Sequence, residues 1–499
     1  MSETPDLGTL TSWHAPWAHL RAAVLGLGVT GFAVADTLAE LGADVLVVAA
    51  GADELRIRMC EVIGVTYVQE SSGSPVPTEL VDFSPEVIVV SPGYRPDHPI
   101  LLWAAQKGVP VWGDIELAWR VRDKVGKPAE WILVTGTNGK TTTVQMTAAM
   151  LATAGFRVAP CGNIGVPVLD AVRDPQGFDV LVVELSSYQL HYLNEIWPHS
   201  AVCLNVADDH LDWHGSFDAY IAAKAKVYNN VAVACVYNKA DARTEDMVEN
   251  ADVLEGARAI GFGLGVPGRS DVGVVEGILC DRAFVDDRHN TATEITTLEE
   301  LHAQGLTAPH IVANILAAAA LARAFGASPE AIAEALNTFR LDAHRNEIVA
   351  HINNVTWIDD SKATNPHAAD ASLAANRSIV WIVGGLLKGV DIDELVAKHV
   401  SRLRGAVIIG RDRTALAAAF ARHAPTLPLA QVSAEETKDV MIHAVNFAAD
   451  MVHTGDVVLL APAAASMDQF TDYAERGRLF AQAVRDRVGG EADGQSASH

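Results

Sequence analysis

Positive charge and long apolar runs are both scarce in this sequence of 499 residues. It holds 37 Lys and Arg residues against 62 Asp and Glu residues, which gives a formal net charge of −25. The chain is acidic and has no run of basic residues, so it lacks the positive charge that would neutralise a nucleic acid or an anionic membrane. No run reaches the roughly 18 apolar residues that span a bilayer, and no signal peptide is visible. We therefore expect a cytoplasmic protein that binds no nucleic acid and does not insert into a membrane.

Cysteine is also rare: the chain has five cysteines, an odd number, and no Cys-x-x-Cys pair. This usage argues against a disulfide framework and fits reduced thiols in a bacterial-type cytoplasm. Cys161 lies in a Gly-rich stretch, where a small buried side chain is a better interpretation than a nucleophile. Hydrophobic residues make up 49% of the chain. Large cores are therefore expected, and the length suggests about three domains of ordinary size.

The most informative motif is a Gly-rich turn between an expected strand at 131–134 and an expected helix at 143–154. Backbone N–H groups in such a turn converge on phosphate oxygens, a lysine reaches the outer phosphates, and a hydroxyl suits Mg²⁺. The residues that would bind ATP in this way are Gly136, Thr137, Asn138, Gly139, Lys140, Thr141 and Thr142. The turn is shorter than the common G-x-x-x-x-G-K-[ST] loop, because Val134 stands where that loop has its first glycine. An ordinary strand–glycine–helix turn is the competing interpretation.

Alternating strand and helix patterns divide the chain into three segments, which we expect to span residues 1–126, 127–342 and 343–499. The expected strands lie at 22–25, 45–48 and 87–90, then at 131–134, 180–183 and 201–206, and finally at 356–358, 379–383, 406–409 and 457–460. Residues 250–300 look rich in β-structure and turns. We predict an α/β fold with three domains: a Rossmann-like N-terminal domain, a central P-loop ATPase-like domain with a mostly parallel sheet, and a C-terminal Rossmann-like domain.

The first segment carries a second glycine motif, Gly26-x-Gly28-x-x-Gly31, after its first expected strand. Alone this pattern is a weak sign of a dinucleotide site. A nicotinamide site also wants an acid at the end of the second strand to hold the ribose. This chain has Ala49 there, followed by Ala-Gly. The pattern therefore favours another phosphate-bearing ligand over a nicotinamide cofactor.

Polar side chains follow the strands of the second segment. Glu184 ends the strand at 180–183, and an acidic cluster with His210 is expected to end the strand at 201–206. Oxygen ligands of this kind suit Mg²⁺, and clustered carboxylates need a cation or hydrogen bonds. The alternatives are a solvent-exposed acid at Glu184 and a capping role for His210. Lys224 lies on an expected helix, where composition alone indicates a solvated lysine.

In the third segment, residues 359–366 bring an acid, a base and two hydroxyls to one strand end, including Asp360 and Lys362. A plain capping turn is the alternative. Lys388 and Ser466 also lie just past expected strands.

Together these motifs make the chain resemble the Mur ligases, the ATP-dependent amide-forming enzymes of bacterial cell-wall synthesis. The resemblance covers nearly the whole chain. The stretches Glu-Leu-Ser-Ser-Tyr-Gln-Leu at 184–190 and Asp-Ser-Lys-Ala-Thr-Asn at 360–365 are most similar to the members that add D-glutamate. The resemblance implies an ATP-dependent ligase that joins D-glutamate to UDP-N-acetylmuramoyl-L-alanine through an acyl phosphate and a tetrahedral intermediate.

The resemblance also implies the residues of the ATP and metal site, which would hold two Mg²⁺ ions. The implied metal ligands are Thr141, Glu184, His210 and Lys224, the last as a carbamate. Lys140, Lys224 and His210 would act in catalysis. Besides the Gly-rich turn, Asn314, Arg345 and Asp360 would position ATP.

The implied substrate contacts come from all three segments, and the enzyme would act as a monomer. They are Val29 and Thr30 for the UDP group, Asn163 and Ser187 in the second segment, and Lys362, Thr364, Lys388, Ser466, Met467 and Tyr473 in the third. Three positions depart from the family pattern. Ala49 replaces an acid near the uracil, Ile311 follows His310 where many members have Asn, and Leu386-Leu387 precede Lys388 where some have Asp-Gly.

Three other interpretations of the chain compete with this one. One is another Mur-type amide ligase, and another is an inert homologue that only holds cell-wall partners. The presence of Lys140, Glu184, Lys224 and Lys362 argues against an inert protein. The third is a nicotinamide oxidoreductase with a kinase-like insert, which lack of nicotinamide binding would dismiss.

Overall fold

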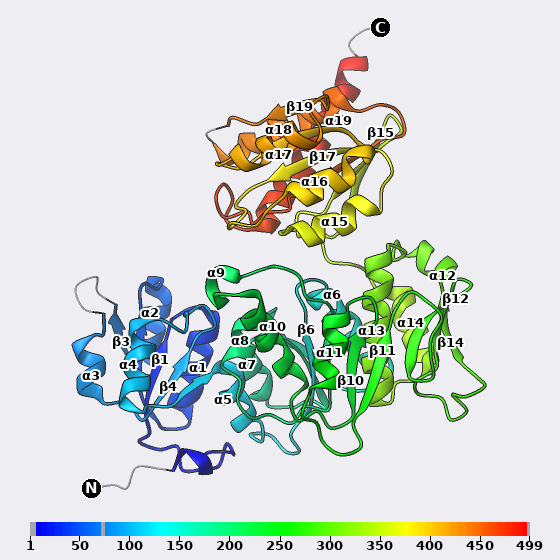
Figure 1. The fold of residues 1–499 in the computed structure, drawn as a ribbon. Coiled ribbons are helices and arrows are strands. Elements are labelled where there is room, and N and C mark those ends of the chain that lie inside the picture. The colour runs from blue at the N-terminus through cyan, green and yellow to red at the C-terminus, as the bar shows by residue number, and fades with distance from the viewer. Residues whose placement is uncertain (1–5, 71–74, 435, 497–499) are drawn as a thin grey trace. The chain divides into compact units, whose positions relative to one another are not determined.

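Runs of buried Val, Ile and Leu form three sheets in the computed structural model, which describes residues 6–70, 75–434 and 436–496 (Figure 1). The chain divides into two compact units. One unit runs to residue 339, apart from 207–209 and 308–310, and the other contains these short pieces and residues 340–499. The first unit holds two of the sheets and the second unit holds one. No helix in the described part of the chain is both long and apolar enough to cross a membrane.

The first sheet has five parallel strands in the order β3-β2-β1-β4-β5. Its elements are β1 (Arg21–Leu25), α1 (Val29–Glu40), β2 (Asp44–Ala49), α2 (Glu54–Val62), β3 (Thr66–Gln69), α3 (Thr78–Phe83), β4 (Val87–Val90), α4 (Pro99–Lys107), β5 (Val111–Gly113) and α5 (Asp114–Arg120). The strand order reverses direction between β1 and β4, and sheets of this kind bind ligands beyond the strand ends at such a point. The Gly26 turn follows β1 and lies at this place.

The second sheet has nine strands in the order β14-β13-β12-β11-β10-β9-β6-β8-β7, and only β13 pairs in antiparallel fashion, with its two neighbours. Its strands are β6 (Glu130–Thr135), β7 (Val158–Gly162), β8 (Val180–Glu184), β9 (Ser200–Cys203), β10 (Ala234–Asn238), β11 (Arg258–Phe262), β12 (Asp271–Val275), β13 (Ile278–Asp281) and β14 (Thr293–Thr297). Its helices are α6 (Lys140–Thr153), α7 (Val168–Val172), α8 (Ser187–His191), α9 (Leu211–His214), α10 (Phe217–Ala225), α11 (Ala242–Glu249), α12 (Leu298–Ala303), α13 (Pro309–Phe325) and α14 (Pro329–Thr338).

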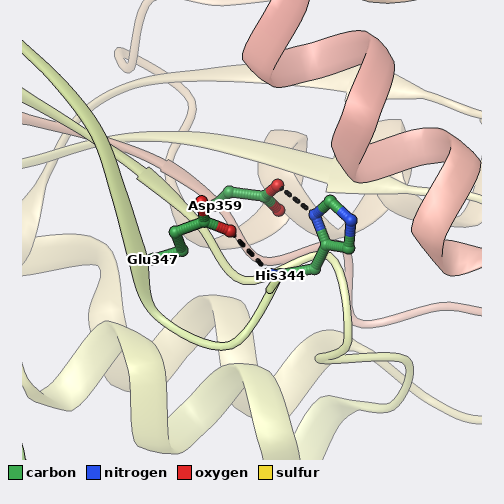
Figure 2. A group of neighbouring side chains, drawn as sticks. All are labelled: His344, Glu347 and Asp359. Atoms are coloured by element: carbon green, nitrogen blue, oxygen red, sulfur yellow. Dashed lines mark hydrogen bonds and ion pairs between the residues drawn. The ribbon is translucent and has the colours of Figure 1, made fainter. Parts of the chain in front are cut away.

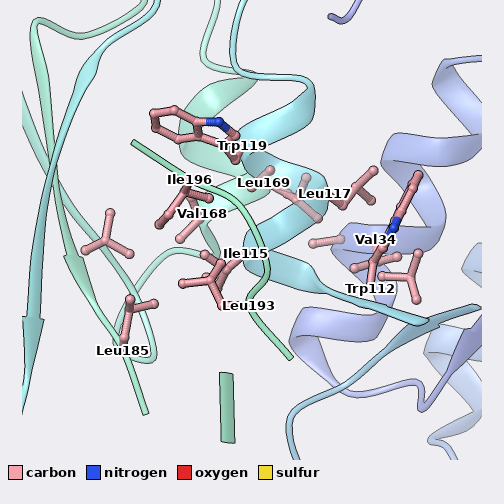
Figure 3. Close-up of a cluster of buried hydrophobic side chains, with 14 of the residues drawn as sticks. Val34, Trp112, Ile115, Leu117, Trp119, Val168, Leu169, Leu185, Leu193 and Ile196 are labelled. Atoms are coloured by element: carbon pink, nitrogen blue, oxygen red, sulfur yellow. The ribbon is translucent and has the colours of Figure 1, made fainter. Parts of the chain in front are cut away.

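One apolar core joins these two sheets. Figure 3 shows Trp112, Ile115 and Leu117 of the first sheet's segment beside Leu169 and Leu193 of the second, all in one buried cluster. Ion pairs reinforce the seam, because the Arg173 guanidinium after α7 lies 2.7 Å from Asp36 and 2.9 Å from Glu40 on α1. The first unit is therefore a single packed body, although it contains two sheets.

The third sheet has six strands in the order β15-β16-β20-β17-β18-β19, and only the edge strand β15 is antiparallel to its neighbour. Its elements are β15 (Glu347–Ile352), β16 (Val355–Asp359), α15 (Pro366–Ala374), β17 (Ile379–Gly384), α16 (Asp393–His399), β18 (Leu403–Ile409), α17 (Thr414–His423), β19 (Leu429–Gln431), α18 (Thr437–Met451), β20 (Val457–Leu460) and α19 (Tyr473–Ser496). Separate apolar clusters line the sheet's two faces.

The predicted α/β class and mostly parallel sheets are confirmed, and nearly every expected strand is present within one or two residues of its expected ends. Three expectations differ in detail. Strand β18 begins at Leu403 rather than at residue 406. Helix α6 begins at Lys140 rather than at residue 143, because Gly139 already supplies its N-terminal cap. Strand β9 ends at Cys203 rather than at 206, so the acidic cluster with His210 follows a loop and not a strand.

Candidate functional site

The Gly-rich turn lies between β6, an inner strand of the second sheet, and α6. Its first glycine, Gly136, has a φ of 149°, and Gly139 has a φ of 85°. The second value lies in the left-handed region, which strongly favours glycine. A Cβ on Gly139 would also stand 2.5 Å from the Asn314 side-chain oxygen. Glycine is therefore needed at this position, and the side chain of Asn314 lies directly beside the turn.

Two lysines converge on this turn. The Lys140 Nζ donates to the carbonyl oxygens of Gly136 at 2.8 Å and Thr137 at 3.0 Å. The Lys224 Nζ donates to the same Gly136 oxygen at 2.9 Å. Lys224 is only 1% exposed, so the expectation of a solvated lysine is wrong. It is buried because helix α10 packs against helices α8 and α9, while its Nζ reaches Thr135 at the end of β6. Spacing along the sequence does not reveal these contacts.

Sequence reasoning missed Asn205, which braces the turn from the loop after β9. Its backbone carbonyl accepts from the Thr137 N–H at 3.0 Å, and its side-chain oxygen accepts from the Asn138 N–H at 2.9 Å. The side-chain amide nitrogen of Asn205 donates a hydrogen bond to the Asn138 carbonyl at 3.1 Å. An asparagine between apolar residues just beyond a central strand is the signal that would have identified it.

Glu184 ends β8 directly beside the turn, since it pairs in register with Val134 of β6. It is 2% exposed, so the alternative of a solvent-exposed acid is wrong. The Asn163 amide donates to one carboxylate oxygen at 2.9 Å. The other oxygen is buried and has no hydrogen-bond partner in the described part of the chain. Such an orphaned anionic oxygen is costly without a cation, so this residue fits a Mg²⁺ ligand.

Aromatic and imidazole side chains cluster around helices α8 and α9. His210 caps α9 with a φ of 55°, and its Nδ1 lies 2.6 Å from the Tyr188 hydroxyl. The His214 Nε2 lies 3.0 Å from the Ser187 Oγ. Burial, with smaller effects from neighbouring positive groups, lowers the pKa of His214 to about 4. The structure thus connects His210, expected as a metal ligand, to the helix that follows Glu184.

The glycine turn of the first sheet lies between β1 and α1. A Cβ on Gly31 would stand 2.0 Å from the Gly26 carbonyl oxygen, which explains why the helix needs glycine there. Val29 and Thr30 form the first residues of α1. A cavity of about 470 Å³ opens beside them, and its lining includes Val29, Asp53, Arg56 and Met59.

In the second unit, Asp360 and Lys362 follow β16. The Asp360 carboxyl group is enclosed although the residue as a whole is half-buried, and this burial raises its pKa to about 6. It accepts hydrogen bonds from the Ser372 hydroxyl and, at 3.2 Å, from the Asn346 N–H. The Lys362 Nζ lies 3.8 Å from the centroid of the Tyr473 ring. The structure therefore brings Lys362 and Tyr473 together, as the sequence analysis expected.

The remaining expected contacts of this unit lie on the loops after β17 and β20. The backbone of Leu386 pairs with that of Ala465, which brings the Lys388 loop beside Ser466. Ser466 is buried, whereas Met467 is 65% exposed. Thr364 lies in the turn after β16, where its N–H donates to the Lys362 carbonyl at 2.8 Å.

Sequence reasoning also missed Arg476, which is fully buried on α19. Its guanidinium donates to the Ser361 hydroxyl at 2.9 Å, the Ser361 carbonyl at 2.8 Å and the Ala464 carbonyl at 3.1 Å. Burial lowers the pKa of Arg476 to about 10. This side chain ties the loops after β16 and β20 together, and a single arginine in a helical pattern gives no sequence signal of that role.

Figure 2 shows His344, Glu347 and Asp359 as one group of neighbouring side chains. Two of them adjoin the expected nucleotide residues Arg345 and Asp360 in the sequence. The ligand atoms of the three drawn side chains lie within 4.8 Å of one another. The His344 Nδ1 lies 2.6 Å from an Asp359 oxygen, and this hydrogen bond raises the pKa of His344. Since the imidazole itself compensates the buried carboxylate, the cluster is satisfied as an ion pair.

Comparison with known proteins identifies relatives of this chain. The Mur ligase middle domain matches residues 134–322, and the Mur ligase glutamate ligase domain matches residues 344–464. A protein of Leifsonia xyli named UDP-N-acetylmuramoylalanine–D-glutamate ligase is 66% identical over 99% of this chain and 98% of its own length. A protein of the same name from Streptomyces avermitilis is 54% identical over 94% of this chain and 98% of its own. The chain therefore belongs to the Mur ligase family.

Solved structures share the fold at low sequence identity. A pseudomurein peptide ligase type C from Methanothermus fervidus matches 88% of this chain and 96% of its own, with a TM-score of 0.54 and 18% identity. The MurF ligase from Thermotoga maritima in complex with ADP matches 82% of this chain and 92% of its own, with a TM-score of 0.52 and 18% identity. These similarities establish the fold alone.

Proposed function

We propose that this protein is an ATP-dependent ligase that joins D-glutamate to UDP-N-acetylmuramoyl-L-alanine in peptidoglycan precursor synthesis. The 66% identity to a relative named for this reaction, over nearly the whole of both chains, carries the choice of substrates. The convergence of Lys140 and Lys224 on the Gly136 carbonyl supports the use of ATP. A solved ligase of the same fold was obtained with ADP, in line with this assignment.

In the proposed reaction, a substrate carboxylate attacks the γ-phosphorus of ATP, and ADP leaves. The resulting acyl phosphate has a good leaving group, which a free carboxylate lacks. The amine of D-glutamate then attacks the carbonyl carbon, a tetrahedral intermediate collapses with loss of phosphate, and the nitrogen loses a proton. Lys140 and the N–H groups of the turn would stabilise the charge that builds on the phosphoryl oxygens.

Two Mg²⁺ ions would neutralise further phosphate charge when bound. Thr141, Glu184, His210 and Lys224 are the proposed ligands, and the orphaned oxygen of Glu184 supports that set. Lys224 would contribute an anionic oxygen after carbamylation, and its complete burial suits a modified lysine. Enzyme equilibrated with ¹³C-bicarbonate should show a carbamate carbon by NMR that is lost in Lys224→Arg. An identical spectrum in both proteins would remove this role.

The other assignments extend the proposal to the substrates. Val29 and Thr30 would contact the UDP group beside the cavity at α1, and Asn163 and Ser187 would contact the substrate near Glu184. Asn314, Arg345 and Asp360 would position ATP. The residues proposed around D-glutamate are Lys362, Thr364, Lys388, Ser466, Met467 and Tyr473. We further propose a monomer with a UDP-substrate domain at 1–126, an ATP domain at 127–342 and an amino-acid domain at 343–499.

Phosphate release tests the proposed function directly. Purified protein is incubated with ATP, Mg²⁺ and UDP-N-acetylmuramoyl-L-alanine, and each of D-glutamate, L-glutamate, L-alanine and a diamino acid is added in turn. Of the four amino acids, we expect only D-glutamate to give rapid phosphate release. Turnover with another amino acid would indicate a different Mur-type ligase, and the absence of ATP-dependent turnover with all four would indicate an inert homologue.

A further inference from the structure

Helix α5 carries two buried carboxylates through an apolar region. Figure 3 shows its residues Ile115, Leu117 and Trp119 inside the core that joins the two sheets of the first unit. On the same helix, Asp114 is 5% exposed and Glu116 is 1% exposed. Buried carboxylates are costly unless hydrogen bonds compensate them, so their bonding partners indicate what they are for.

Asp114 bonds to the helix that follows the proposed metal ligand Glu184. Its Oδ2 accepts from the Gln189 Nε2 at 2.9 Å. The carbonyl end of the Gln189 amide then accepts from the Ser186 N–H at 3.1 Å, which completes the capping box of α8. The Asp114 carboxylate can only accept a hydrogen bond, so it holds the NH₂ end of the Gln189 amide. The oxygen end of that amide is thereby turned toward the Ser186 N–H at the start of α8.

Glu116 holds the other end of the same segment. Its Oε2 accepts from the backbone N–H groups of Asn194 at 3.2 Å and Glu195 at 3.3 Å. Its Oε1 pairs with Arg120 at 2.8 Å. The two acids of α5 therefore bracket residues 186–195, one at each end.

The bracketed segment carries groups that the proposed reaction uses. Glu184 lies immediately before it, Ser187 begins α8, and the Tyr188 hydroxyl contacts His210 at 2.6 Å. A displacement of α8 would therefore disturb both proposed metal ligands that flank it. No other carboxylate of the first sheet's segment has a hydrogen bond, among those described, to the residues of the capping box.

We propose that Asp114 is a positioning residue for the metal site, acting through Gln189 on the segment that follows Glu184. The inference rests on the proposed function, since it assigns a task within that site. The Asp114 Oδ1 is buried without a partner among the described residues, and burial raises the pKa of Asp114 to about 6. An apolar side chain at position 114 would avoid the free-energy cost of burying a carboxylate. The hydrogen bond to Gln189 therefore explains why an aspartate is present.

Direct metal binding tests this assignment apart from turnover. Full-length protein with a non-hydrolysable ATP analogue is titrated with Mn²⁺, and free ion is followed by electron paramagnetic resonance. Asp114→Ala should weaken Mn²⁺ binding by about tenfold, as is typical when a group supporting a metal ligand is removed. Asp114→Asn should bind within about twofold of wild type, because a carboxamide oxygen can still accept from Gln189.

Asp123→Ala is the matched control. Asp123 accepts two hydrogen bonds at 2.6 Å, from the Ser12 hydroxyl and the Trp13 N–H, and neither residue belongs to the proposed site. We expect both alanine variants to unfold at lower temperature, but only Asp114→Ala to change Mn²⁺ binding. If Asp114→Ala does not fold, Gln189→Met removes the same bond from its other side and should weaken Mn²⁺ binding equally.

The outcomes separate this inference from the proposed function. Wild-type protein that binds no Mn²⁺ with the nucleotide analogue would contradict the proposed metal site itself. If wild type binds Mn²⁺ and Asp114→Ala or Gln189→Met binds it equally well, Asp114 only stabilises the fold. Equal losses in Asp114→Asn and Asp114→Ala would also overturn the assignment, because the hydrogen bond would then not be the cause.

Discussion

The two glycine turns of the first unit have similar backbones but different surroundings. Each follows an inner strand of a parallel or mostly parallel sheet, and each begins with a glycine at positive φ, 96° at Gly26 and 149° at Gly136. The turn at Gly136 is surrounded by polar side chains from other elements, including Lys224, Asn205 and Asn314. The turn at Gly26 instead leads to Val29, which is 58% exposed and lines a cavity of about 470 Å³. The spacing of the glycines thus sets the path of the backbone in each turn. The side chains that surround the turn come from other elements, and we expect them to decide which ligand binds.

The sharpest test of this difference removes the lysine that only the second turn carries. Lys140→Ala should reduce ADP formation at least about 100-fold, because the charged group that we propose stabilises the phosphoryl oxygens is lost. The Tm should stay close to that of wild type. Lys107→Ala, at the exposed end of α4, is the control and should retain full activity. A Lys140→Ala enzyme with wild-type turnover would show that the two turns do not differ in function as we propose.

A second test asks whether glycine serves the backbone of the first turn. Gly31→Ala should destabilise the protein by about 1–3 kcal/mol, since its Cβ would stand 2.0 Å from the Gly26 oxygen. Gly28→Ala is the matched variant, because a Cβ there meets no atom within 4 Å. It should unfold at the wild-type denaturant concentration. Equal stability of the two variants would contradict the close approach of α1 to β1.

The third test concerns the ligand of the first turn, where Ala49 replaces the expected acid. Arg56 lines the cavity beside Val29, whereas Arg58 on the same helix does not. Arg56→Ala should raise the KM for UDP-N-acetylmuramoyl-L-alanine about fivefold through loss of one charged hydrogen bond, with kcat little changed. Arg58→Ala should leave both constants unchanged. A larger KM effect from Arg58 would place the UDP group elsewhere.

The smallest expected effect is a pH dependence near the second turn. The folded-state pKa of His214 is lowered to about 4, so between pH 6.5 and 4 the unfolded chain binds a proton that the folded chain does not. This residue therefore lowers stability as the pH falls through that range. His214→Gln can still hydrogen-bond with the Ser187 hydroxyl, and its Tm should fall less than that of wild type between pH 7.5 and 5. Parallel Tm curves for the two proteins would contradict the depressed pKa.

The features that could be predicted from the sequence are those that depend on the spacing of residues within one strand or turn. The turn at 136–142 and the strand-end positions of Glu184 and Asp360 follow from strand patterns and from the rule that parallel strands end at one edge. The burial of Lys224 and the bracing by Asn205 and Arg476 did not follow. These contacts join residues far apart in the chain, and a lone Lys, Asn or Arg has the same composition whether it is solvated or enclosed.

The apolar seam between the first two sheets has a consequence for dissecting the protein. A fragment cut after residue 126 would expose Trp112, Ile115 and Leu117, which the intact chain buries against the second sheet's segment. Apolar patches of this kind promote aggregation. A fragment that ends near Phe339, where the first compact unit ends, keeps this surface covered. For crystallisation, or for ligand screening of the proposed UDP site, that longer fragment is the piece to express.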